Sequence, residues 1–200
     1  MGFFSFSRRE LIWGGLIGLV LGLVAGYFIW KEVQRPSLYG LLRQEWVKNV
    51  IGKPALVLES PEPLEIATDP AGASLNGLIR NMVTAGYVHE EGFSIQASVV
   101  SYVAGLEPER DAAADGFLNE LQHLGVSDLE FSRREGALGK QQGLVQKGQF
   151  KDSGGLKQFE NHLLVSGDQL WMLTLTYPSD HPAGPELCRR VVESVELVME

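Results

Sequence analysis

The longest apolar stretch of the chain runs from Leu11 to Trp30 and contains no charged residue. As an α-helix it would rise about 30 Å, at about 1.5 Å per residue, which matches the hydrocarbon thickness of a bilayer. A core helix of a water-soluble domain is seldom so long and apolar on every face. The pattern therefore predicts a single transmembrane helix over Leu11–Trp30, behind a short tail of residues 1–10.

Four glycines recur at every fourth position of this run, at Gly14, Gly18, Gly22 and Gly26. This spacing puts them in a slowly drifting stripe on the helix, where the absence of side chains lets another helix approach closely. Glycine is also simply common in membrane helices. We favour a packing face, a glycine zipper, whose partner is a second copy of the chain or another membrane protein.

Two features of the sequence favour a cleaved export signal over a permanent membrane anchor. The segment Ser7–Ile12 resembles the twin-arginine export motif, and Val24–Gly26 would serve as a weak signal-peptidase site. The apolar segment of a secretory signal normally has about 7 to 15 residues, whereas this run continues to Trp30 and ends only at Lys31. We therefore predict an uncleaved signal anchor.

Residues typical of a membrane interface stand at both ends of the predicted helix. They are Arg8, Arg9, Trp13, Trp30 and Lys31. Positive charge next to a span favours the cytoplasm, and the two sides nearly balance. Because the two arginines lie tightly against the span on a short amino tail, we place the large carboxyl-terminal part on the non-cytoplasmic side of the cell membrane.

Residues 31–54 are predicted to form a juxtamembrane connector. Pro36 interrupts the membrane helix, and Ser37 can cap a short amphipathic helix that Gly52 and Pro54 close. The apolar positions of this helix recur at helical spacing: Leu38, Leu41, Leu42 and Trp46. The helix could lie on the membrane with Trp46 as an interface anchor, or it could pack against the domain that follows.

From residue 55 to 200 the pattern changes to short alternating segments separated by turn residues. Alternation predicts strands over 55–59, 64–67, 93–103, 126–133, 143–150, 158–165 and 169–177. Helical spacing predicts helices over 75–83, 108–124 and 185–198. The middle helix has a buried stripe of Ala113, Phe117, Leu118, Leu121 and Leu124. Short connections favour an antiparallel sheet covered by helices, which is an α+β fold.

Three segments carry a resemblance to a known family. They are the strand Phe93–Val103 with the alanine-rich helix Glu107–Leu124, the strand Gly143–Gly148, and the closing Leu170–Tyr177 followed by Cys188–Leu197. This layout resembles the PsbP-like fold, which is shared with the Mog protein. The resemblance implies an α/β/α sandwich around an antiparallel sheet and a non-catalytic accessory or assembly role. No partner-binding residue of that family transfers to this chain.

The charge of the chain is uneven along its length. The formal net charge is −8; the first 48 residues carry +3, so residues 49–200 carry −11. Such an acidic domain repels nucleic-acid phosphate and anionic lipid headgroups, which argues against a nucleic-acid partner. The single cysteine, Cys188, excludes an intramolecular disulfide, and its apolar helical setting predicts a small buried hydrophobe.

The sequence contains no motif that is typical of catalysis, cofactor binding or metal binding. The histidines are scattered, at His89, His123, His162 and His181, without the spacing of metal ligands. We therefore expect a membrane-anchored, non-catalytic interaction domain that assists the assembly or stability of a membrane or envelope complex. One alternative is a binder of a small apolar ligand, with Trp171 and Phe159 lining a cleft. Another is a hydrolase whose catalytic residues assemble from distant positions.

Overall fold

β-Strands make up most of the chain that the structure describes. The structure is a computed structural model, and it describes residues 37–67 and 78–198. A compact unit begins at Leu38. The predicted transmembrane helix Leu11–Trp30 lies outside the described residues. Within 37–67 and 78–198, no helix is long and apolar enough to cross a membrane.

Three helices and ten strands are described. The helices are α2 (Leu38–Arg43), α3 (Arg110–His123) and α4 (Gly184–Glu193). The strands before α3 are β1 (Val47–Ile51), β2 (Ala55–Ser60), β3 (Glu65–Ala67), β4 (Ile79–Val88) and β5 (Ser94–Tyr102). Those after it are β6 (Ser127–Leu138), β7 (Gln141–Asp152), β8 (Gly155–Ser166), β9 (Gln169–Pro178) and β10 (Glu196–Val198).

The strands form two antiparallel sheets. The larger has seven strands in the order β3-β4-β5-β9-β8-β7-β6, and the smaller has the order β1-β2-β10. The turn between β8 and β9 contains Gly167, whose φ of 58° suits the tight hairpin predicted from the sequence. β5 joins the two halves of the large sheet because it pairs with both β4 and β9.

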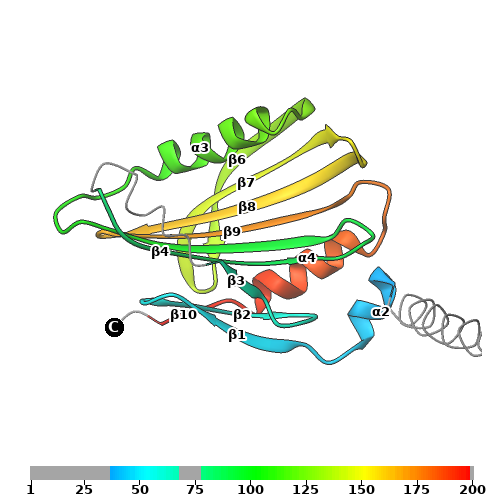
Figure 1. Ribbon diagram of the computed structural model, residues 1–200, viewed down its shortest axis with the longest axis horizontal. Helices are drawn as coiled ribbons and strands as arrows, with labels where there is room; N and C mark the ends of the chain where they lie inside the picture. The colour runs from blue at the N-terminus through cyan, green and yellow to red at the C-terminus, as the bar shows by residue number, and fades with distance from the viewer. Residues whose placement is uncertain (1–36, 68–77, 199–200) are drawn as a thin grey trace, which may run out of the picture. The chain divides into compact units, whose positions relative to one another are not determined.

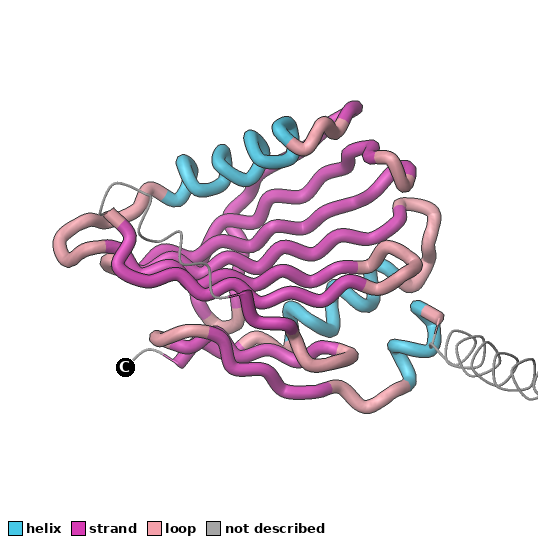
Figure 2. The backbone as a smooth tube through the Cα atoms, in the orientation of Figure 1, coloured by secondary structure: helices cyan, strands magenta, loops and turns pink. Residues whose placement is uncertain are grey.

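The large sheet is the central layer of the unit. Figures 1 and 2 show α3 on one face and, on the other, α4 together with the small sheet and α2. We call these the α3 face and the α4 face. The sequence-based expectation of an α+β fold built on an antiparallel sheet is confirmed at this level.

The core divides according to these faces. On the α4 face, side chains of β5 and β9 pack against α2, α4 and β2, and Trp171 and Cys188 are fully buried there. On the α3 face, two smaller apolar clusters lie beneath the helix, around Leu163 and around Phe159. The prediction that Cys188 is a buried hydrophobe is confirmed, and burial raises the pKa of its thiol.

The connector expected over residues 31–54 differs from the structure. The short helix ends at Arg43, and β1 follows it and pairs with β2. Gly52 does not end a helix but turns the chain from β1 to β2 with a φ of +70°. A Cβ at Gly52 would come within 2.7 Å of the Val99 side chain, so the turn requires glycine both for its backbone and for its space.

Two predicted helices are wrong in type or extent. Residues 79–83, assigned to a helix over 75–83, belong to strand β4, which pairs along its length with β5. The last helix was expected to reach residue 198, but it ends at Glu193 and the chain then forms β10 against β2. In both places cross-strand hydrogen bonding and burial override a spacing of apolar residues that also suits a helix.

Candidate interaction site at the edge of β6

β6 is the outermost strand of the large sheet on the side away from β3. It is 12 residues long and pairs only with β7 among the described strands. Figure 1 shows it beyond β7, beside α3. Most of its residues are exposed. Its outer backbone N–H and C=O groups therefore face no other strand of the described chain, which makes this edge a template for pairing with another chain.

The strand is anchored on its α3 face by ion pairs to α3. The Arg110 guanidinium lies 2.7 Å from the Glu135 carboxylate, and Arg133 donates to Asp115. These contacts hold the middle of β6 beneath the helix while leaving its outer edge open. The Arg133 guanidinium also lies 5.5 Å from the centre of the Phe131 ring, which is 48% exposed.

The charged residues of β6 form blocks along the strand. Acidic residues stand in its first part, at Asp128 and Glu130, basic residues follow at Arg133 and Arg134, and Glu135 comes directly after them. The Glu130 carboxylate accepts one hydrogen bond, at 2.9 Å, from Gln149 on β7. The described residues offer no ion-pair partner to the exposed Arg134 side chain. An open edge that carries both acidic and basic side chains is suited to select the partner strand as well as its direction.

A pocket adjoins this edge on the α4 face. It measures about 500 Å³ and lies between β6, β7, β8 and the outer side of α4. The ionisable side chains of its lining are Arg134, Lys147, Glu160, His162, Arg189 and Glu193. Cross-strand register explains why they meet, since Lys147 is opposite Glu160 and both point to the α4 face.

Glu160 is the centre of this charged group. Its carboxylate lies 2.7 Å from the Lys147 ammonium and 3.3 Å from Nε2 of His162. Burial alone would raise the pKa of Glu160, but the hydrogen bonds to His162 and Lys147 and the charge of Lys147 lower it below the ordinary glutamate value. Glu160 is therefore ionised at neutral pH and acts as a hydrogen-bond acceptor.

His162 is buried, and only one of its ring nitrogens is engaged. Nε2 faces Glu160, while Nδ1 is buried without a hydrogen-bond partner among the described residues. A His paired with a carboxylate resembles two thirds of a catalytic triad, but a triad also needs a hydroxyl or thiol at the other nitrogen. The described chain does not place one there. The sequence could have suggested Glu160 and His162 as neighbours, because residues two apart share a strand face, but it could not supply Lys147.

A second hollow lies over β3, β4 and β5. It measures about 560 Å³, and its lining includes Glu65, Thr84 and Gln96. A row of buried polar side chains continues beneath α3, where Thr174 donates to Asn161 at 3.1 Å and Asn161 donates to Gln146 at 3.5 Å. The sequence does not reveal this row, because its members come from separate strands.

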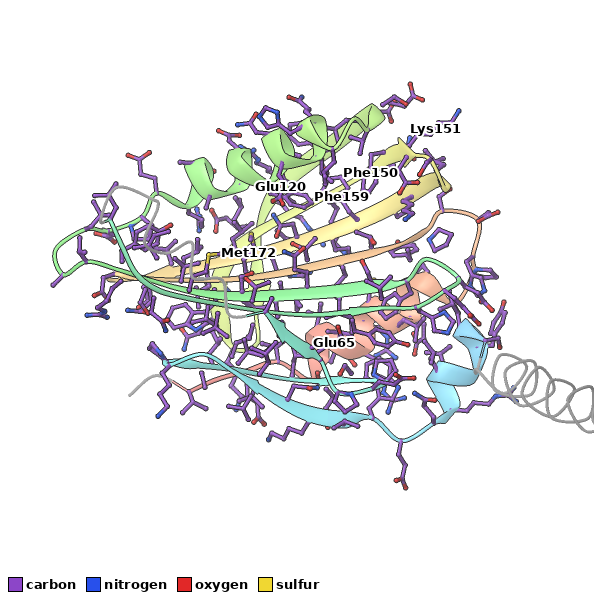
Figure 3. All side chains as sticks on the ribbon, in the orientation of Figure 1. Glu65, Glu120, Phe150, Lys151, Phe159 and Met172 are labelled. Atoms are coloured by element: carbon purple, nitrogen blue, oxygen red, sulfur yellow. The ribbon has the colours of Figure 1, made fainter. Side chains whose placement is uncertain are left out.

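Trp171 and Phe159, which were expected to line one ligand cleft, lie on opposite faces of the large sheet. Figure 3 shows Phe159 beside Phe150, between β8 and α3. Trp171 belongs to the core on the opposite face of the same sheet. Both side chains are buried, at 1% and 0% exposed. The sheet separates them, so they cannot line one cavity.

Of the predicted membrane residues, the structure describes only Trp46. Its indole packs against the core, donates a 2.7 Å hydrogen bond to the carbonyl of Leu41 and lies 4.1 Å from the Arg190 guanidinium. Packing against the domain was one of the two placements that the sequence left open. The other predicted membrane residues lie outside the described residues: Arg8, Arg9, Trp13, Gly14, Gly18, Gly22, Gly26, Trp30 and Lys31.

Comparison with known proteins gives only distant likenesses. No protein-family model and no curated protein sequence matches the chain. Among solved structures, LpqN, a Mycobacterium tuberculosis protein involved in cell envelope biogenesis, is similar with a TM-score of 0.47 and 12% identity over 79% of this chain and 94% of LpqN. A protein from Bacteroides thetaiotaomicron is similar with a TM-score of 0.41 and 14% identity, over 72% of this chain and 46% of the other. These values assign neither a family nor a function.

Proposed function

We propose that this chain is a membrane-tethered, non-catalytic interaction domain that assists the assembly or stability of a membrane or envelope complex. The observation that carries the proposal is the open outer edge of β6. An extended segment of a partner can add to such an edge as a further strand, with main-chain hydrogen bonds giving affinity and side chains giving specificity. The exposed Phe131 ring and the exposed Glu130 and Arg134 side chains supply that side-chain selection.

The charged pocket supports a binding role rather than catalysis. Glu160 is held ionised by Lys147 and His162, so it is already engaged as an acceptor by both groups. The buried Nδ1 of His162 has no nucleophile within hydrogen-bond reach in the described part. A general base needs that reach to the proton it abstracts.

The proposed tether is the apolar segment Leu11–Trp30, which would keep the domain at the non-cytoplasmic surface of the membrane. The finer likeness to PsbP-like accessory proteins belongs to the same proposal. Its support is the arrangement of an antiparallel sheet between helices, together with the closing order of strand, loop and helix in β9 and α4.

Site-specific photo-cross-linking in intact membranes tests the proposal. The full-length chain carries a photoreactive phenylalanine analogue at Phe131, and a matched control carries it at Val88, which is 79% exposed on β4. We expect a discrete cross-linked species from position 131 that is absent from position 88. If position 131 yields no cross-linked protein, the edge is not a docking surface and the proposal fails.

A second candidate function is the binding of a small polar ligand in the pocket beside α4. Its volume falls within the range of about 300 to 1,000 Å³ that is usual for ligand sites, and the unpartnered nitrogen of His162 favours a polar occupant. Native mass spectrometry of the wild-type protein released from its own membranes would show a bound small molecule. The same measurement on the His162→Leu variant would show the protein without it. A wild-type mass equal to that of the bare chain would contradict this candidate.

A further inference from the structure

We infer that the segment that docks on β6 is β6 of a second copy of this chain, paired antiparallel about a two-fold axis through Ser132. This inference rests on the proposed function, which requires only that some partner strand occupies the edge. It adds the identity of the partner and the register. It stands on the open edge and on the self-complementary charges of the strand.

Symmetry restricts the possible registers. When two identical strands pair about an axis perpendicular to the sheet, one residue lies opposite its own copy and its neighbours pair on either side. Centring the axis on Ser132 places Glu130 opposite Arg134 of the second copy, and the same pair forms again on the other side. It also places each Phe131 opposite Arg133 of the other chain. Two ion pairs and two cation–π contacts therefore form at once.

Neighbouring registers lack this match. Centring the axis on Arg133 or on Arg134 sets two arginines directly opposite one another, and like charges in that position are unfavourable. Centring the axis on Phe131 places Arg134 of one copy opposite Asp128 of the other. Asp128 lies in the irregular segment between Ser127 and Glu130, where the ladder with β7 is interrupted and its own φ is 52°.

The faces of the sheet agree with the pairing. Glu130 and Arg134 lie opposite Gln149 and Val145 of β7, so both point to the α4 face and meet on one side of the joined sheet. Arg133 points to the α3 face, where it already lies over the Phe131 ring at 5.5 Å. The second copy would therefore add Glu130–Arg134 ion pairs on the α4 face and Phe131–Arg133 cation–π contacts on the α3 face. No side chain has to change to the other face of the sheet.

The single residue on the axis allows a direct test. The only native cysteine, Cys188, is buried, so the wild-type chain provides a background without an accessible thiol. The full-length Ser132→Cys chain in its own membranes is expected to form a disulfide-linked dimer on mild oxidation. Ser127→Cys is the matched control, since in this register the two copies of residue 127 would be separated by ten residues, about 33 Å.

A charge exchange tests the pairs themselves. Glu130→Arg alone, or Arg134→Glu alone, makes both cross-strand pairs repulsive, and each should weaken association about tenfold. Mixing the two variants restores opposite charges at every pair, so tagged chains of the two kinds should co-purify as a heterodimer while neither pairs with itself. A mixture that associates no better than either variant alone would overturn the register.

The results separate this inference from the proposed function. If Ser132→Cys gives no dimer while the probe at Phe131 still cross-links to a different protein, the second copy is not the occupant and the docking edge stands. If Phe131→Cys gives more dimer than Ser132→Cys, the inferred axis is wrong. If neither the cysteine nor the photo-probe gives a product, both proposals fail.

Discussion

Removal of the segment before Gly52 is expected to unfold the domain. The sequence pattern assigns residues 31–54 to a connector, and on that basis a chain beginning near Gly52 should fold alone. The structure instead places α2 and β1 within the compact unit that begins at Leu38. A chain beginning at Ser37 should therefore fold, and a chain beginning at Gly52 should not.

The size of the effect follows from what the segment buries. Leu38 and Leu41 are 0% exposed and Ile51 is 1% exposed. Burial of each such side chain contributes about 1.5–3 kcal/mol, so about 5–9 kcal/mol is lost with the three. The Asn49 side chain also donates to Ser60 at 2.8 Å and accepts from the backbone N–H of Leu64 at 2.9 Å. The loss is comparable to the whole stability of a typical domain, about 5–15 kcal/mol.

Urea unfolding followed by circular dichroism measures this difference. The chain that begins at Ser37 should show a single cooperative transition, and the chain that begins at Gly52 should show none or aggregate. A third chain, beginning at Ser37 with Leu38→Ala and Leu41→Ala, keeps the β1 ladder and controls for deletion itself; it should lose about 4–10 kcal/mol. If the chain that begins at Gly52 unfolds cooperatively with nearly unchanged stability, the assignment of α2 and β1 to the domain is wrong.

Three further predictions use single or paired substitutions. Leu118→Ala should destabilise the domain by about 2–5 kcal/mol because the side chain is 7% exposed, whereas Leu124→Ala, at 74% exposed, should change stability by less than about 0.5 kcal/mol; equal losses in thermal unfolding would contradict this. Because the pKa of Glu160 is lowered in the folded state, its ionised carboxylate stabilises the fold above the unfolded pKa of 4.5, and this stabilisation is lost as the pH falls through the folded pKa. Glu160→Gln should therefore lower the free energy of unfolding at neutral pH and progressively less in acid. A difference in unfolding free energy that does not change with pH would refute the ion-pair account. In the predicted membrane helix, replacing Gly18 and Gly22 by Leu should abolish the signal of a reporter of helix association, because the added side chains prevent close approach; an unchanged signal would remove self-association through the glycine stripe.

Elements with one strong local signal were predicted well. The alternation that predicts a strand over 93–103 identified β5 (Ser94–Tyr102), and the glycine in the turn at Gly167 identified the β8–β9 hairpin. The helix Arg110–His123 was also expected, with Gly125 beyond its end at a φ of +78°. Within its predicted stripe, Leu118 is buried but Leu124, the residue that caps the end of the helix, is exposed.

The candidate site was largely hidden from the sequence. The pattern predicts a short strand that ends at Arg133 and leaves Arg134 outside it, but β6 continues to Leu138 and forms the edge of the sheet. Edge position depends on the order of strands, and strand order does not follow from the chain order. Glu160 and His162 were visible as polar positions, yet their partner Lys147 comes from another strand and is set by register.

Local sequence patterns were enough to predict the alternating or helical character of most segments, the acidity of the domain and a membrane helix over Leu11–Trp30. These properties depend on residues close together in the chain, where side-chain periodicity and turn chemistry act directly. Contacts between distant residues establish that residues 79–83 form a strand, that β1 belongs to the domain and that no other described strand pairs with the outer edge of β6. Hydrogen bonding between strands and burial between layers join residues far apart in the chain, and they outweigh local preference wherever that preference is weak.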